Sequence, residues 1–178
     1  MSKRQRLSKG IVQIYYGTGK GKTTAALGQG FRAAGHGFRV YMIQFMKGNI
    51  KYGELKSVQK FDNFTIEQFG SPELISVPDD FDMSEGEKAL RKAEEVIISD
   101  EYDIVIIDEA GVAIDMEIID VDKLIAILDK KPPLLEIVIT GRMMHPKLLE
   151  YADLVTEMRM IKHPYVSQGL DARFGIEH

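Results

Sequence analysis

The sequence predicts a single three-layer α/β domain, in which a mostly parallel central sheet is covered by helices on both faces. Short apolar runs alternate with helical patterns along the whole chain, which is typical of βα units. The runs show little two-residue alternation, as expected for strands buried on both faces. Glycine-rich or charged segments follow several runs, where α/β sheets bind their ligands. We expect residues 10–178 to form this domain and residues 1–9 to form a flexible basic arm.

The composition of the 178-residue chain argues against several classes of function. A net charge of −4 disfavours sequence-independent nucleic-acid binding, which needs a basic surface. The chain has no cysteine, so it offers neither a disulfide framework nor a thiolate metal site. The start lacks the apolar segment of a signal peptide, and no apolar run approaches the roughly 20 residues that span a bilayer. We therefore expect a cytoplasmic protein with neither nucleic acid nor a membrane as a partner.

Hydrophobic spacing predicts the elements in order. The expected strands are residues 11–16, 39–45, 64–69, 102–107, 137–140 and 154–158. The expected helices are residues 22–34, 84–97, 121–128 and 147–151. Ser84 and Glu87 have capping-box spacing, which predicts that the second helix begins there, after a long loop over residues 70–83. Gly28 and Gly30 weaken the first helix, so we expect them to mark close packing against the sheet.

A glycine-rich loop between the first strand and the first helix predicts a phosphate-binding site, because loop N–H groups and the helix dipole attract anions. Lys22 would reach the outer phosphates, and Thr23 would ligate a bridging Mg²⁺. The fold would then be that of a P-loop NTPase of the RecA-like type. The loop is one residue shorter than the consensus, since three residues separate Gly17 from Gly21, and it contains an additional lysine, Lys20. Its predicted ligand-binding residues are Gly17, Thr18, Gly19, Lys20, Gly21, Lys22, Thr23 and Thr24.

An acidic pair, Asp108 and Glu109, ends the apolar run at residues 102–107. Carboxylates at this position hold or orient magnesium in P-loop proteins, whereas elsewhere such a pair is more often a turn. Beside a phosphate loop the magnesium interpretation is favoured. We therefore predict Thr23, Asp108 and Glu109 as metal ligands, and Lys22, Thr23 and Glu109 as the catalytic residues.

Other side chains have weaker signals. Lys47 and Arg142 follow strand ends, where they would contact phosphate or remain solvated. The histidines lack the spacing of zinc sites, so a metal cluster is not expected. His163 is the one histidine kept as a candidate site residue. The methionines would fill the core or line an apolar cleft for a large planar ligand; they include Met42, Met46, Met143, Met144, Met158 and Met160.

Several motifs occur together in one known family. Residues 17–24 read Gly-x-Gly-Lys-Gly-Lys-Thr-Thr, residues 44–48 read Gln-Phe-Met-Lys-Gly, and residues 140–142 read Thr-Gly-Arg. Asp108 and Glu109 end the apolar run at residues 102–107, and residues 152–177 read like a C-terminal signature motif. With these motifs the chain resembles, from about residue 10 to 177, the P-loop ATP:corrinoid adenosyltransferases of cobalamin synthesis and salvage.

The resemblance implies attack by a reduced corrinoid cobalt on the 5′ carbon of ATP, with tripolyphosphate as the leaving group. ATP would be the co-substrate, Mg²⁺ the cofactor and the corrinoid the substrate, with a flavodoxin-type protein as a potential reductant. Family members bind the nucleotide reversed relative to P-loop hydrolases and form homodimers. Lys47, Arg142, Glu157 and His163 lie in the matching segments and are assigned to ligand binding with the loop. The chain departs from the family in lacking tryptophan, and therefore the Phe-x-Trp element near the corrinoid, and in its short arm.

Two alternatives to adenosyl transfer remain open from the sequence. A generic P-loop NTPase or kinase would use Glu109 to orient water or a substrate hydroxyl. A non-catalytic relative would bind the nucleotide or the corrinoid without turnover.

Overall fold

The computed structural model describes residues 6–48, 51–73 and 75–177. A six-stranded sheet with the order β3-β2-β4-β5-β1-β6 lies at its centre, and every strand pair is parallel. The strands are β1 (Val12–Tyr16), β2 (Val40–Gln44), β3 (Phe64–Gln68), β4 (Ile104–Asp108), β5 (Glu136–Gly141) and β6 (Leu154–Glu157). The helices are α1 (Lys22–Gly35), α2 (Gly53–Val58), α3 (Asp80–Ile98), α4 (Ala110–Asp115), α5 (Val121–Leu128), α6 (Pro146–Tyr151) and α7 (Pro164–Gln168).

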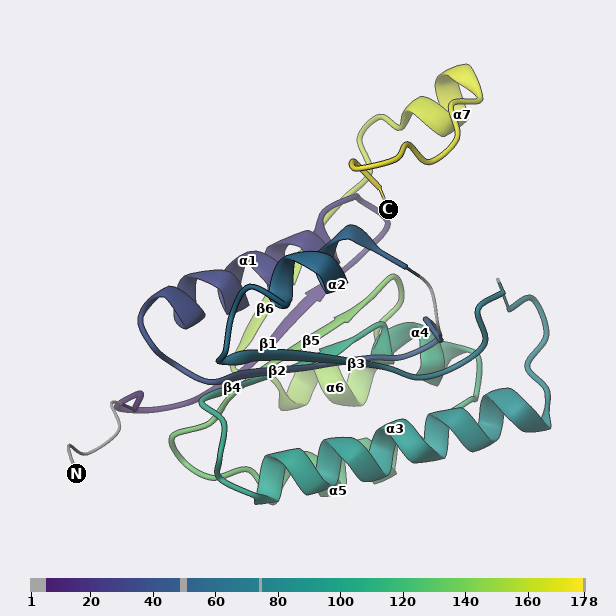
Figure 1. The fold of residues 1–178 in the computed structure, drawn as a ribbon. Helices are drawn as coiled ribbons and strands as arrows, with labels where there is room; N and C mark the ends of the chain where they lie inside the picture. Colours follow the sequence, from purple (N-terminus) through teal and green to yellow (C-terminus); the bar gives the residue numbers. More distant parts are fainter. Residues whose placement is uncertain (1–5, 49–50, 74, 178) are drawn as a thin grey trace.

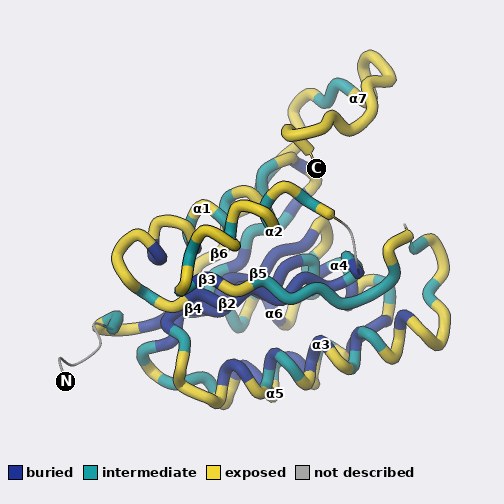
Figure 2. The backbone as a smooth tube through the Cα atoms, in the orientation of Figure 1, coloured by how far each residue is buried: buried dark blue, intermediate teal, exposed yellow. Residues whose placement is uncertain are grey.

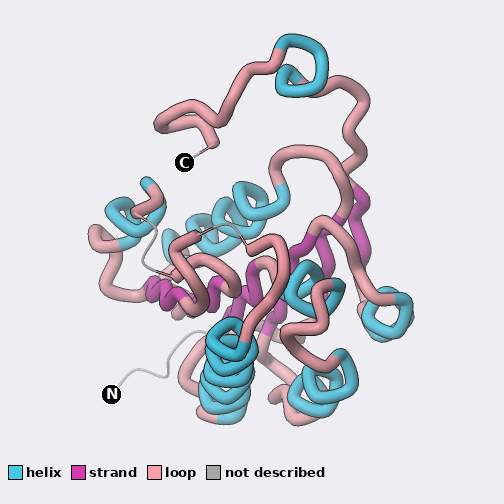
Figure 3. Tube along the Cα trace, turned by 90° about the vertical axis from the view of Figure 1, so that its right-hand side faces the viewer, coloured by secondary structure: helices cyan, strands magenta, loops and turns pink. Residues whose placement is uncertain are grey.

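Helices cover both faces of the sheet, so the predicted three-layer α/β fold is confirmed. Figure 1 shows α1 and α2 on one face and α3 and α5 on the other, and Figure 3 shows the same layers after a quarter turn. Strand β4 serves both cores: Ile104 and Ile106 pack under α1, whereas Val105 and Ile107 pack against the opposite helices. Both faces of the central strands are therefore buried, as Figure 2 shows.

The order of the strands positions the loop and the acidic pair. Strand β5 lies between β1, which leads into the glycine loop, and β4, which ends at Asp108. Because all strands run in the same direction, their carboxyl ends meet at one edge of the sheet. The loop, Asp108 and the end of β5 are thereby brought together at that edge.

The expected strands all form, but the helices differ from the prediction. Helix α3 begins at Asp80 rather than at Ser84, because Asp79 and Asp82 form the capping box and Ser84 lies within the helix. The long loop is correspondingly shorter. Helices α2, α4 and α7 were not predicted; none exceeds 6 residues, and such short segments carry little periodicity.

The glycines of α1 have different surroundings. A Cβ atom at Gly30 would lie 2.8 Å from the ring of Phe64, which confirms the expected close packing at that position. A Cβ atom at Gly28 would meet nothing within 4 Å. The packing explanation is therefore wrong for Gly28, which is exposed.

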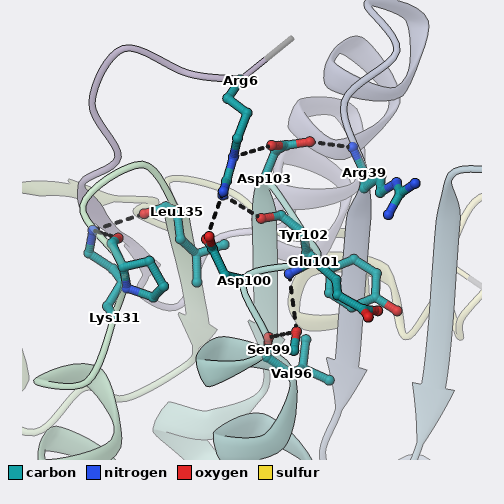
Figure 4. A network of polar contacts seen from close by, with 11 residues as sticks. Arg6, Arg39, Val96, Ser99, Asp100, Glu101, Tyr102, Asp103, Lys131 and Leu135 are labelled. Carbon is teal, nitrogen blue, oxygen red and sulfur yellow. Dashed lines mark hydrogen bonds and ion pairs between the residues drawn. The ribbon is translucent and has the colours of Figure 1, made fainter. Parts of the chain in front are cut away.

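A polar network lies at the amino-end edge of the sheet (Figure 4). The guanidinium of Arg6 donates to the carboxylate of Asp103 and to the carbonyl of Tyr102, and its other nitrogen lies 2.8 Å from Asp100. The buried Asp103 carboxylate also accepts the backbone N–H of Arg39. Arg6, in the expected arm, thus contacts the domain, whereas residues 1–5 lie outside the described residues. The division into an arm and a domain stays a prediction.

Candidate nucleotide-binding site

The glycine loop connects β1 to α1 and needs glycine for steric reasons. Gly17 and Gly21 have φ angles of 113° and 115°, which disfavour residues with a side chain. A Cβ atom at Gly17 would lie 2.5 Å from the carbonyl oxygen of Met158, and one at Gly19 would lie 2.8 Å from the same oxygen. The chain that follows β6 therefore packs directly against the loop.

Hydrogen bonds hold this packing in place. The N–H of Gly19 donates to the carbonyl of Met158 over 2.6 Å, and the N–H of Met160 donates to the hydroxyl of Thr18 over 3.3 Å. On the other side, the N–H of Gly17 lies 3.2 Å from the carbonyl oxygens of both Gly141 and Arg142. The loop is thus held between the ends of β5 and β6. The backbone contact with Met158 could not be predicted from the sequence.

The loop lysines differ in their surroundings. The ammonium of Lys22 donates to the carbonyl of Gly19 over 2.8 Å. Burial lowers the pKa of Lys22, while the nearby Glu109 carboxylate opposes this shift. Lys20 is more exposed; its ammonium lies 3.1 Å from the carbonyl of Ile176 and 3.8 Å from the carboxylate of Glu177. The phosphate-binding roles of both lysines stay predictions.

The carboxylate of Asp108 is the centre of the site. Its Oδ1 atom accepts the hydroxyl of Thr23 over 2.8 Å and the hydroxyl of Thr140 over 2.7 Å. Its Oδ2 atom accepts the ammonium of Lys47 over 2.7 Å and the side-chain amide of Gln44 over 3.3 Å. Asp108 has no exposed surface, so these donors compensate a carboxylate that water does not reach.

Glu109 lies next to this centre in an unusual backbone conformation. Its φ of 61° and ψ of 14° place a non-glycine residue in the left-handed region, at the start of α4. Burial raises the pKa of the Glu109 carboxyl, and the Asp108 charge raises it further. Burial alone would lower the pKa of Lys47, but the Asp108 carboxylate raises it overall. Lys47 is therefore a cation held between acidic groups.

Two functional candidates were missed by the sequence prediction. Gln44 accepts the amide of Gln68 over 3.0 Å and donates to Asp108, so a polar chain crosses three neighbouring strands. Thr140 donates to Asp108 and accepts the N–H of Glu109. Both residues stand at or next to the carboxyl end of a strand, and both lie in the motifs at residues 44–48 and 140–142, but the prediction gave them no role in the site.

A cleft of about 640 Å³ opens beside the acidic centre, between α1 and α2. Polar groups of Thr23, Lys47 and Glu109 lie on its wall, as does Thr24. Its apolar wall is mainly aromatic and consists of Leu27, Phe31, Tyr52, Val58, Phe61 and Phe64. Residues Gly175, Ile176 and Glu177 of the C-terminal segment border the same space. The cleft thus joins a charged end to an apolar end, which suits a ligand with an anionic part and a planar part.

The remaining predicted residues lie at the edge of this arrangement. Arg142 is exposed, but its charge helps to lower the pKa of Lys22. Glu157 is exposed at the end of β6, where its carboxylate lies 3.9 Å from Arg159. His163 caps α7 by accepting the N–H of Tyr165. Neither Glu157 nor His163 borders the cleft, and their ligand-binding roles stay predictions.

The expected role of core filler is confirmed for one methionine, whereas Met160 is exposed and the role of lining a cleft for a planar ligand stays a prediction. Met42 is fully buried in the core. Met83, Met143 and Met144 border a second cleft of about 730 Å³, between the starts of α3, α5 and α6. This second cleft has acidic residues at its rim, including Glu87 and Asp120.

The donor set fits a magnesium ion. Within the described residues, no group of three or more His, Cys, Asp or Glu side chains could hold a metal by itself. Magnesium in phosphate sites needs fewer protein ligands, because it keeps waters and binds the phosphates of the substrate. Thr23 and Glu109 border the cleft and offer oxygen atoms of the kind that magnesium prefers, whereas the buried Asp108 carboxylate accepts the hydroxyl of Thr23 behind them, so its role as a direct ligand stays a prediction. No described helix has the length and apolar character to cross a bilayer.

Comparison with known proteins assigns the chain to a family. The family model described as "ATP:corrinoid adenosyltransferase BtuR/CobO/CobP" matches residues 8–178. A corrinoid adenosyltransferase from Sinorhizobium sp is 37% identical over 173 residues, which cover 95% of this chain and 80% of the relative. A corrinoid adenosyltransferase from Pseudomonas aeruginosa is 30% identical over 97% of this chain and 85% of its own length. The corrinoid adenosyltransferase CobA from Salmonella typhimurium is 30% identical over 96% of this chain and 86% of its own length. The chain therefore belongs to the ATP:corrinoid adenosyltransferase family.

Proposed function

We propose that this protein transfers the 5′-deoxyadenosyl group of ATP to the Co(I) centre of a reduced corrinoid and releases tripolyphosphate. The observation that carries the proposal is the junction of a shortened phosphate loop, a buried Lys47–Asp108 pair and an aromatic cleft in a member of this family. Each part matches one part of ATP: the loop and lysines match the triphosphate, and the cleft matches the nucleoside.

The reaction needs no protein nucleophile. The electron pair of Co(I) attacks C5′, so that a Co–C bond forms while the bond from C5′ to the triphosphate oxygen breaks. The electron pair of the broken bond leaves with tripolyphosphate, which gains negative charge. The protein would position the reactants and stabilise that charge through Lys20, Lys22 and the loop N–H groups.

Lys47 and the acidic pair would serve the reacting end of the triphosphate. A magnesium ion held by Thr23 and Glu109, with Asp108 accepting the hydroxyl of Thr23 behind them, would supply further positive charge to the phosphate oxygens. Lys47 lies 2.7 Å from Asp108, which supports a role for its ammonium beside the predicted phosphate position. Arg142 would add charge at the outer side of the loop.

The cleft supports a reversed nucleotide, as the family resemblance implies. In P-loop hydrolases the residue equivalent to Thr23 marks the outer phosphates, and attacking water arrives beyond them. Here the space beyond Thr23 leads into aromatic walls that include Phe31 and Phe61, whose rings meet edge to face at 5.4 Å. Such walls suit a stacked adenine better than a water molecule. The nucleoside would therefore lie on the side of Lys47 and Glu109.

Other properties follow from the family and are proposed with the function. We infer a cytoplasmic homodimer that receives its corrinoid reduced, with a flavodoxin-type protein as a candidate reductant. The absence of cysteine agrees with a compartment in which disulfides are not needed.

The deciding experiment supplies ATP, Mg²⁺ and chemically reduced cobalamin, and it identifies both products. Adenosylcobalamin and tripolyphosphate in equal amounts are expected. ADP and phosphate formed without dependence on corrinoid would instead indicate an NTPase or kinase. Tight ATP binding without any product would indicate a non-catalytic relative.

A variant links the activity to the loop. Lys22→Ala should abolish ATP use, because the ammonium that would contact the phosphates is lost. Lys60→Ala, at an exposed position away from the loop, is the control and should keep the activity. An unchanged rate in Lys22→Ala would refute the site assignment.

A further inference from the structure

The hydroxyl of Thr140 connects both acidic residues of the site. Its Oγ1–H donates to Oδ1 of Asp108 over 2.7 Å, and its Oγ1 accepts the backbone N–H of Glu109 over 2.9 Å. Thr140 has no exposed surface and does not border the cleft. It therefore cannot touch a bound nucleotide, and any effect on the ligand must act through Asp108 and Glu109.

The position of Thr140 follows from the order of the strands. Strand β5 lies between the loop strand β1 and the acidic strand β4, and Thr140 is in register with Tyr15 of β1. A short polar side chain at this point reaches the neighbouring carboxylate at the end of β4. The hydroxyl of Thr23 reaches the same Oδ1 atom from the helix side, at 2.8 Å. Asp108 is thus held from both sides in one orientation.

The bond to Glu109 holds a strained backbone. A non-glycine residue in the left-handed conformation is strained and persists where its surroundings enforce it. The φ of 61° at Glu109 directs its side chain to the cleft, and the hydrogen bond from its N–H to Thr140 fixes that peptide. Loss of the Thr140 hydroxyl would remove one of the four donors to Asp108 and leave the N–H of Glu109 without this acceptor.

We propose that Thr140 is a positioning residue for the metal and triphosphate, because its single hydroxyl sets the orientation of Asp108 directly and of Glu109 through the backbone. The inference rests on the proposed function in one respect, namely that Mg²⁺ and a polyphosphate are the ligands of the site. Hydrogen-bond partners of metal ligands affect metal affinity by about 10- to 100-fold when they are removed.

The test compares Thr140→Val, which keeps the shape and removes the hydroxyl, with Thr140→Ser, which keeps the hydroxyl. Thr156→Val is the matched control, because Thr156 faces the same Tyr15 from the other neighbouring strand and is exposed. Binding of inorganic tripolyphosphate to the full chain is measured by calorimetry, with and without MgCl₂. Thermal unfolding shows that each variant is folded, and Thr140→Ala replaces Thr140→Val if that variant does not fold.

Thr140→Val should weaken the Mg²⁺-dependent binding of tripolyphosphate at least about tenfold. Binding without Mg²⁺ should be nearly unchanged, and Thr140→Ser and Thr156→Val should stay within about threefold of the parent protein. Equal Mg²⁺ dependence in Thr140→Val and Thr140→Ser would overturn the proposal. Equal loss with and without Mg²⁺ would also overturn it, since that pattern indicates a general structural role.

The outcome is separable from that of the proposed function. If the parent protein shows the expected Mg²⁺ dependence and Thr140→Val loses it, the inference stands even when no adenosylcobalamin is formed. If adenosylcobalamin is formed and Thr140→Val binds Mg²⁺ and tripolyphosphate normally, the function stands and the inference fails.

Discussion

The ammonium of Lys47 lies 2.7 Å from the carboxylate of Asp108, and both side chains are largely shielded from water. Removal of one partner would leave the other charge buried without compensation. We predict that Lys47→Met lowers the free energy of unfolding by about 3 kcal/mol in Mg²⁺-free buffer, measured by urea denaturation. MgCl₂ should restore part of the loss, because a cation can then compensate Asp108.

The exposed position Lys60 provides the control for this prediction. Lys60→Met removes the same charge from the same fold and should change stability by less than about 0.5 kcal/mol. Equal losses in the two variants would show that the Lys47–Asp108 pair is no special source of stability.

The raised pKa of Glu109 predicts how stability depends on pH. The unfolded chain releases this proton near pH 4.5, whereas the folded protein holds it to higher pH. The folded state therefore binds more protons in this window, and the contribution of Glu109 to stability falls as pH rises through it. Glu109→Gln cannot ionise, so it should be more stable than the parent protein at pH 7–8 and similar to it below about pH 4.

Urea denaturation at several pH values checks this trend. Glu150→Gln, at an exposed position, is the comparison and should show almost no pH-dependent difference from the parent protein. A stability gain of Glu109→Gln that was independent of pH would contradict the assigned cause.

The sequence predicts the sheet well because parallel strands buried on both faces are nearly continuous apolar runs, as in Ile104–Asp108. It predicts the short helices poorly, because segments such as Gly53–Val58 are too brief to show a helical period. The start of α3 was misplaced because two capping boxes compete in the sequence. Backbone geometry selects Asp79 and Asp82, and spacing alone does not reveal that choice.

Charged residues of the site were predictable because strand ends in a parallel sheet converge, which brings Lys47 to Asp108. The contribution of Thr140 depends on strand order, since β5 must lie between β1 and β4 for its hydroxyl to reach Asp108. Strand order is not encoded in any local pattern. For the same reason, the contact between Gly19 and Met158 was not accessible from the sequence.

Gly19 of the loop and Gly28 of α1 should respond oppositely to alanine. A Cβ atom at Gly19 would approach the Met158 carbonyl oxygen to 2.8 Å, so Gly19→Ala must separate the loop from the chain after β6. We predict at least a tenfold loss of ATP affinity, roughly 1.4 kcal/mol, in calorimetry. Gly28 has open space around it, and Gly28→Ala should stabilise α1 by about 0.5–1 kcal/mol. Unchanged ATP binding in Gly19→Ala would show that the loop tolerates the displacement.

The C-terminal segment predicts a competition at Lys20. The Lys20 ammonium contacts the carbonyl of Ile176 and lies 3.8 Å from the Glu177 carboxylate, so it cannot hold this segment and a phosphate fully at once. Glu177 borders the nucleotide cleft, where its charge would repel an incoming triphosphate. Glu177→Gln should therefore bind tripolyphosphate about two- to fivefold more tightly, a range typical of exposed ion pairs.

Salt supplies a second readout for this competition. The gain in Glu177→Gln should shrink in 1 M NaCl, because the Debye length falls to about 3 Å. Asp171→Asn removes the same charge from the same exposed segment, and Asp171 does not border the nucleotide cleft, so this variant should leave affinity unchanged. Weaker binding in Glu177→Gln would indicate instead that Glu177 assists the ligand, for example by holding Lys20 in place.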